Sequence, residues 1–98
     1  MRVELSSEAE AQALYIDSWW RGQRRASPDL FESELDLTIE RVAFDPKLGT
    51  VYEQTDIDET VYRVLMPRTH HHVYYVLRNE VLFVLAVWGA VKERGPRL

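Results

Sequence analysis

The apolar residues of this 98-residue chain change their spacing at about Gly49. Before that position they recur every three or four residues, which is the spacing of one face of an α-helix. After it they alternate or run together, and valine and tyrosine become frequent, as in β-strands. The change predicts an α+β domain whose helical first half packs on a sheet built from the second half.

The first helix is predicted over residues 8–22. Ser7 and Glu10 fit a capping box, in which the serine hydroxyl accepts from the Glu10 N–H and the carboxylate bonds back to the start of the helix. Gly22 is the predicted end. Several apolar residues on this helix are aromatic or long, so it carries more apolar surface than a single stripe can bury.

The second helix is predicted to begin at the triplet Ser27-Pro28-Asp29 and to end near Phe44. Serine is a preferred cap, proline suits the first helical position, and aspartate in the first turn complements the helix dipole. Pro46 stops the helix because its ring cannot continue one. The short link between the two helices predicts an antiparallel helical hairpin.

Five strands complete the prediction. Alternating residues place Tyr62, Val64 and Met66 on one face of their strand. The last strand is apolar on both faces, which is typical of a central strand covered on both sides. The predicted strands span residues 2–5, 50–53, 60–66, 71–77 and 80–88. The order β-α-α-β-β-β-β predicts a helical hairpin packed on an antiparallel sheet, and residues 1–98 as a single domain.

Composition excludes several classes of protein. The chain has no cysteine, so disulfides, thiolate zinc sites and cysteine nucleophiles are absent. The longest strongly apolar run, residues 81–91, is too short to span a bilayer and lies far from the N-terminus. We therefore expect a cytoplasmic protein that does not contact the membrane.

The charges are unevenly distributed. The formal net charge of −4 argues against a dedicated nucleic-acid-binding protein. Residues 1–60 carry six Lys and Arg against fourteen Asp and Glu, a net −8, whereas residues 61–98 carry six against two, a net +4. This division predicts a basic sheet surface that faces an acidic partner, with ordinary scatter of exposed charges as the alternative.

Chemical motifs are few. His70, His71 and His72 are consecutive, and on a strand only His70 and His72 would share a face, so we expect part of a contact surface and no metal site. No serine-nucleophile motif or glycine-rich phosphate loop is present, and no cofactor is expected. Trp19 and Trp20 point about 100° apart on a helix, so we expect one of them to be left for a partner.

Three segments, in this order and spacing, resemble the RelE/ParE superfamily of bacterial type II toxins, and the ParE branch most closely. The first resembles the passage from helix to sheet, the second an arginine-bearing strand followed by a tyrosine-rich one, and the third the last strand and basic tail. They are DPKLG at residues 45–49, YRVLMPRTHHHVYY at residues 62–75 and LAVWGAVKERGP at residues 85–96.

The resemblance implies a toxin that binds and inhibits a target such as DNA gyrase. It also implies a cognate antitoxin that neutralises the toxin in a hetero-oligomer, with no catalysis and no sequence-specific nucleic-acid binding by the toxin alone. An amphipathic antitoxin helix would suit the helical hairpin, and acidic side chains would suit the basic part. The partner-binding residues predicted from these arguments are Trp19, Arg63, Arg68, His70, His72, Arg78, Lys92, Arg94 and Arg97.

Two alternatives remain open. RelE-type members cut mRNA on the ribosome, and in this chain His71, Arg63 and Arg94 would be the catalytic residues, with His70 or His72 as alternatives to His71. A non-toxic relative that only binds an antitoxin is the other alternative. It is permitted because Gly89 stands where many relatives have histidine and Val91 where a basic residue is common.

Overall fold

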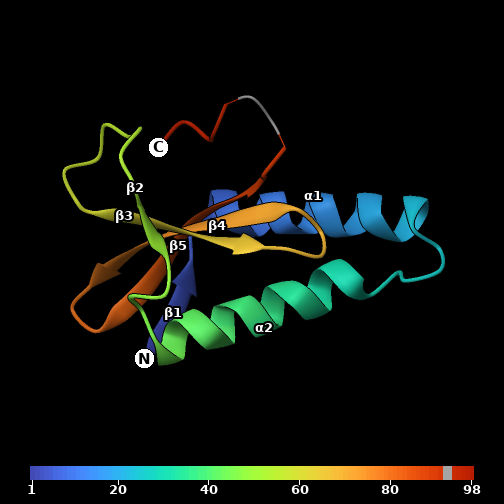
Figure 1. Ribbon diagram of the computed structural model, residues 1–98, viewed down its shortest axis with the longest axis horizontal. Coiled ribbons are helices and arrows are strands. Elements are labelled where there is room, and N and C mark those ends of the chain that lie inside the picture. The colour runs from blue at the N-terminus through green and yellow to red at the C-terminus, as the bar shows by residue number, and fades with distance from the viewer. Residues whose placement is uncertain (92–93) are drawn as a thin grey trace.

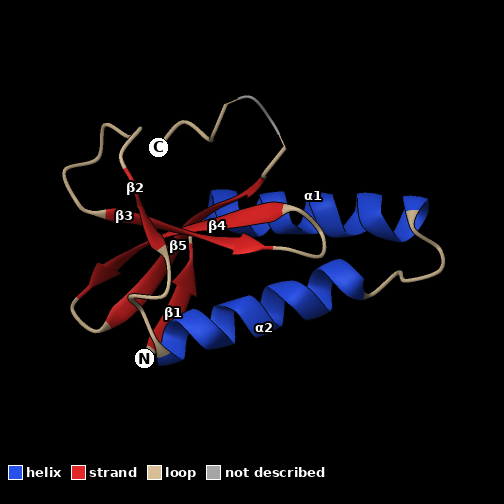
Figure 2. Ribbon diagram, in the orientation of Figure 1, coloured by secondary structure: helices blue, strands red, loops and turns tan. Residues whose placement is uncertain are grey.

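The computed structural model describes residues 1–91 and 94–98. Figures 1 and 2 show a sheet from which two helices extend, joined at their far end by a short loop. No helix in the described part of the chain is long and apolar enough to cross a membrane. The elements follow the predicted order: β1 (Arg2–Leu5), α1 (Ser7–Gln23), α2 (Leu30–Phe44), β2 (Thr50–Tyr52), β3 (Val61–Met66), β4 (His71–Arg78) and β5 (Val81–Gly89).

The five strands form one sheet in the order β1-β5-β4-β3-β2. Neighbours among β2 to β5 pair antiparallel, which confirms the predicted antiparallel arrangement of those four strands. β1 pairs with β5 in parallel, with Arg2 opposite Val81 and Leu5 opposite Val84. The sheet is therefore mixed and not wholly antiparallel, a feature that four alternating residues at the N-terminus could not encode.

The cap of α1 is Ser6, and the prediction of Ser7 is wrong by one residue. The Ser6 hydroxyl accepts a hydrogen bond from the Ala9 N–H at 3.0 Å. The same hydroxyl donates to the Leu85 carbonyl oxygen at 3.0 Å. Ser6 thus joins the helix to β5 as well as capping it, and this second bond, to a residue 79 positions away, is invisible to local sequence reasoning.

The predicted inner ends of the hairpin also need correction. α1 continues past Gly22, and α2 begins at Leu30 with Asp29 as its N-cap and no side-chain cap bond. The Ser27 hydroxyl is therefore not the cap. The backbone carbonyl oxygen of Ser27 accepts instead from the Leu30 N–H at 3.2 Å and from Trp20 Nε1 at 2.9 Å. A buried indole needs an acceptor, so this bond fixes the hairpin loop onto Trp20.

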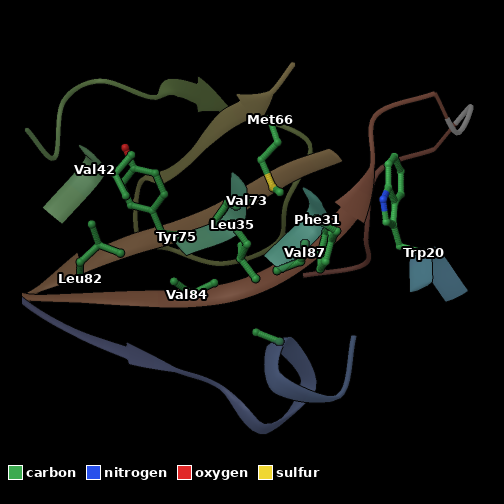
Figure 3. Packing of buried hydrophobic residues seen from close by; sticks show 11 residues of the cluster. Trp20, Phe31, Leu35, Val42, Met66, Val73, Tyr75, Leu82, Val84 and Val87 are labelled. Carbon is green, nitrogen blue, oxygen red and sulfur yellow. The ribbon is translucent and has the colours of Figure 1, made fainter. Parts of the chain in front are cut away.

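The main core lies between the helices and one face of the sheet (Figure 3). Tyr62, Val64 and Met66 contribute to it, so the predicted inner face of β3 is confirmed. Burying this much apolar surface is the main stabilising contribution to the fold. The fully or nearly buried members are Ala9, Trp20, Phe31, Leu35, Val42, Met66, Val73, Tyr75, Leu82, Val84 and Val87.

The opposite face of the sheet is partly covered by the C-terminal segment. Trp88 Nε1 donates to the Arg94 carbonyl oxygen at 2.9 Å, and Leu98 packs against the apolar residues of this face. The C-terminus accordingly lies beside the loop between β2 and β3 (Figure 1), where Thr55 Oγ1 is 3.5 Å from the Leu98 carbonyl oxygen. β5 is thus apolar on both faces because both are covered, as predicted for a central strand.

Tyr75 joins the sheet to the segment that follows α2. Its hydroxyl, at the end of a fully buried side chain, donates to the Pro46 carbonyl oxygen at 2.8 Å and accepts from the Gly49 N–H at 3.1 Å. Tyr75→Phe removes both bonds, so we expect the free energy of unfolding to fall by about 1–3 kcal/mol. Urea denaturation measures this, with Tyr15→Phe on the exposed side of α1 as the control. Equal midpoints for the two variants would contradict the prediction.

Candidate partner-binding groove

Trp19 and Trp20 divide the apolar surface of α1 between the core and the outside. Trp20 is 8% exposed, whereas Trp19 is 46% exposed. Their rings meet edge to face with centroids 6.3 Å apart. Leu14 and Tyr15, one turn earlier, are also mostly exposed. The prediction that one of the two tryptophans is left outside the core is confirmed, and it is Trp19.

Trp19 and Tyr15 line a groove of about 880 Å³. One wall is the side of α1, and the facing wall is the turn that joins β3 to β4. The end of β5, with Val87 and Trp88, also lines it. Three segments that are far apart in the sequence therefore create one mostly apolar, aromatic-rich concavity, which is the usual character of a binding site.

Basic side chains surround this groove. The guanidinium carbon of Arg24 lies 5.6 Å from the centre of the Trp19 ring and 5.7 Å from that of Trp20, within cation–π range. Arg68 and His70 line the groove from the facing turn. No acidic residue occurs among the described residues of its lining. The groove therefore suits an apolar segment with acidic flanks, and it brings together Trp19, Arg68 and His70 from the predicted partner-binding set.

Glu34 on α2 holds the turn that forms the facing wall, and sequence reasoning missed it. The side chain is 7% exposed. Oε2 accepts from the Arg68 N–H at 2.8 Å, while Oε1 accepts from the Thr69 N–H at 2.9 Å and from Thr69 Oγ1 at 2.7 Å. The available signal was position: Glu34 lies three residues after buried Phe31, on the apolar stripe of the helix, where a carboxylate requires donors.

The three histidines occupy three different settings. His70 belongs to the turn before β4, with φ 59°, so the strand alternation assumed in the prediction does not apply to it. His71 lines the groove and packs edge to face against Phe31, with ring centroids 5.1 Å apart. His72 faces the other side of the sheet, where its ring lies 6.0 Å from that of Tyr74. The prediction that His70 and His72 share a face is therefore wrong.

Arg63 lies on the same side of the sheet as His72. Its guanidinium carbon is 5.3 Å from the centre of the Tyr52 ring. Burial lowers the pKa of His72, and the positive charge of Arg63 lowers it further, so the imidazole is neutral near pH 7. Burial raises the pKa of the neighbouring Tyr74 hydroxyl, and Arg63 opposes that rise. This second cluster thus joins one cation, one neutral imidazole and two phenols.

The residues expected to cut RNA are not assembled. His71 packs on the helix side of the sheet, against Phe31, whereas Arg63 lies on the opposite side, over Tyr52. Arg94 is exposed in the C-terminal segment, where its carbonyl oxygen accepts from Trp88 Nε1. Among the described residues, no group of three or more histidines and acids is placed to hold a metal ion.

The remaining predicted basic residues lie elsewhere. Arg78, at the end of β4, pairs with Glu59 at 2.7 Å between Nη2 and Oε1, and its guanidinium carbon is 5.0 Å from the Phe83 ring centre. Arg97 is exposed near the C-terminus, and Lys92 lies outside the described residues. The basic half of the sequence therefore does not form the single surface expected of it. Its charges are divided between the groove, the opposite face of the sheet and the end of β4.

The lowered pKa of His72 makes stability depend on pH. The unfolded chain takes up a proton near the ordinary value of 6.5, whereas the folded chain does so only at lower pH. Since the unfolded state then binds more protons, we expect the free energy of unfolding to decrease from about pH 7.5 to about pH 5. His72→Asn should make this decrease smaller, and His70→Asn, in the exposed turn, is the control. Urea denaturation across that range tests it, and identical slopes for wild type and His72→Asn would refute it.

No protein-family model and no curated protein matches the sequence. Solved structures with a similar fold include the following two. A chain of the chromosomal ParDE TA system from P. aeruginosa has a TM-score of 0.63 and 11% sequence identity, with 91% of this chain and 95% of that chain covered. A chain of the intact E. coli RelBE toxin–antitoxin complex has a TM-score of 0.57 and 15% identity, with 93% and 98% covered. The chain thus has the RelE/ParE-like α+β fold, as the three sequence segments implied.

Proposed function

We propose that this chain is the toxin of a bacterial type II toxin–antitoxin module, ParE-like, acting in the cytoplasm as a single domain over residues 1–98. The observation that carries the proposal is the match of nearly its whole length to chains from two toxin–antitoxin systems. The three segments that resemble the RelE/ParE superfamily also support it, because their likeness lies in the residues themselves.

The antitoxin is proposed to bind in the groove beside α1. An amphipathic helix would place its apolar residues against Tyr15 and Trp19 and its acidic residues near Arg24, Arg68 and His70. A partner segment that is disordered when free would fold as it binds, which links its ordering to neutralisation of the toxin. The expected assembly is a toxin–antitoxin hetero-oligomer.

The toxin is proposed to act by binding its target, with DNA gyrase as the first candidate. This follows from the ParE-like segments together with the geometry of the groups expected to catalyse. His71 and Arg63 lie on opposite faces of the sheet, so they cannot act on one phosphodiester. Inhibition by binding requires no such constellation.

Cleavage of mRNA on the ribosome is the second candidate, and one observation favours it. On the outer face of the sheet, Arg63 lies beside His72 and Tyr74, and His72 is neutral at pH 7. A neutral imidazole can accept a proton, and a guanidinium can stabilise a phosphate. In this version the catalytic histidine is His72, one of the three that the sequence offered, and not His71.

Expression of the chain alone distinguishes these functions. Growth arrest with altered plasmid supercoiling and intact mRNA supports the ParE-like toxin. Arrest with ribosome-dependent mRNA cleavage that His72→Asn abolishes supports the RNase. Normal growth, with binding of the antitoxin encoded beside the chain, identifies a non-toxic antitoxin-binding relative, and normal growth without such binding removes the toxin proposal altogether.

A further inference from the structure

The β3–β4 turn, which Glu34 holds, also forms backbone hydrogen bonds with its neighbours. The His70 N–H donates to the Met66 carbonyl oxygen at 2.9 Å, and the His70 carbonyl oxygen accepts from the Ala90 N–H at 2.8 Å. His70 has φ 59°, in the left-handed region, which is uncommon for residues other than glycine although histidine adopts it more readily than most. Hydrogen bonds to β3, to α2 and to the segment after β5 hold the turn in this conformation, and the buried Glu34 carboxylate accepts three of them.

We propose that Glu34 is a positioning residue for the groove: by fixing the β3–β4 turn from behind, it holds Arg68 and His70 where acidic side chains of a bound segment can reach them. The identity of that segment as an antitoxin rests on the proposed function, but the placement of the two basic side chains does not. Glu34 itself would not touch the partner, because the turn lies between them.

The chemistry of the contact requires a carboxylate. Two carboxylate oxygens accept from three donors, two backbone N–H groups and the Thr69 hydroxyl. A glutamine has one acceptor oxygen, and its NH₂ group would face at least one of those donors. Glu34→Gln therefore loosens the turn with little change in side-chain volume. Glu40→Gln, at an exposed position of α2, removes the same charge and is the matched control.

The first test measures the free chain. Amide hydrogen exchange at Arg68 and Thr69 should be about tenfold faster in Glu34→Gln than in wild type and unchanged in Glu40→Gln, because local opening of the turn requires those bonds to break. Thr69→Val removes only the hydroxyl donor, so it remains close to the wild-type fold and should accelerate exchange at Arg68 to a smaller extent. Unchanged exchange in both Glu34→Gln and Thr69→Val would overturn the proposal.

The second test measures binding of a synthetic amphipathic helix of about 20 residues, about 30 Å long, with leucine on one face and glutamate along both flanks. Glu34→Gln and Arg68→Ala should each weaken binding about tenfold and reduce its dependence on salt. Binding by the double variant should also be about tenfold weaker than by wild type, not a hundredfold weaker, because the two changes remove the same contribution to binding. Additive losses with an unchanged salt dependence would mean a purely structural role and overturn the proposal.

The two proposals fail in different ways. A chain that arrests no growth and binds no antitoxin removes the proposed function and leaves the exchange and peptide results intact. A toxin whose Glu34→Gln variant binds the peptide like Glu40→Gln removes the positioning role of Glu34 alone. Failure of the peptide to bind wild type would contradict the acidic character assigned to the partner, and with it the role of Arg68 and His70.

Discussion

Replacing Trp19 with alanine is expected to weaken binding of the proposed antitoxin by about 30-fold or more, the effect of removing a well-placed tryptophan from the centre of an interface. The indole is half exposed, lies in the groove and is flanked by the Trp20 ring and the Arg24 guanidinium. It therefore offers a large rigid apolar surface at little cost in side-chain entropy. Calorimetric titration of the purified chain with the proposed cognate antitoxin measures the loss.

Phe44→Ala is the matched control for Trp19→Ala. Phe44 is 94% exposed at the end of α2 and does not line the groove. Both side chains are aromatic and accessible, so both variants should keep a free energy of unfolding within about 1 kcal/mol of wild type. If Phe44→Ala weakened antitoxin binding as much as Trp19→Ala, or if Trp19→Ala left binding unchanged, the groove would not be the binding site.

Replacing Phe31 with alanine is expected to lower the free energy of unfolding by about 3–5 kcal/mol. Its ring is 1% exposed, belongs to the main core and supports His71 at the groove through an edge-to-face contact. The cavity left behind cannot close easily, because α2 and β4 are both held by other bonds and contacts. The free energy of unfolding of a domain of this size is only about 5–15 kcal/mol in total, so the variant should be close to unfolding at 37 °C.

Urea denaturation of Phe31→Ala and Leu37→Ala gives the comparison. Leu37 is 46% exposed on the same helix, so its truncation should cost less than about 1 kcal/mol. Circular dichroism of Phe31→Ala below the transition should retain the helix and strand signals. A loss of less than about 1 kcal/mol for Phe31→Ala would contradict its place in the core.

Spacing of apolar residues was enough to predict every helix and strand, because each element buries apolar residues against one face of the sheet or the other. The direction of strand pairing and the N-cap residues of the helices could not be predicted from the same spacing. β1 pairs in parallel with β5 from the other end of the chain, and Ser6 is selected as a cap by a bond to Leu85. Ser27 acts through its carbonyl oxygen. Each of these depends on a partner distant in sequence or on a backbone atom, neither of which a local pattern contains.

The candidate site divides in the same way. Trp19 could be predicted because two adjacent tryptophans on a helix cannot both enter a small core. The prediction that His70 shares a face with His72 failed because it assumed strand geometry, whereas His70 adopts a left-handed turn conformation. Arg24 and Glu34 were missed because their importance comes from the groove and from the turn behind it, both of which exist only when α1, α2 and the sheet have packed together.

The most direct measurement is growth of cells that express the chain or its Trp19→Ala variant, each with and without the proposed cognate antitoxin. Both versions are expected to arrest growth when expressed alone, and the antitoxin is expected to restore growth only to cells with the wild-type chain. Restoration of both would contradict the groove as the antitoxin site. Normal growth with the chain alone would contradict the assignment of this protein as a toxin.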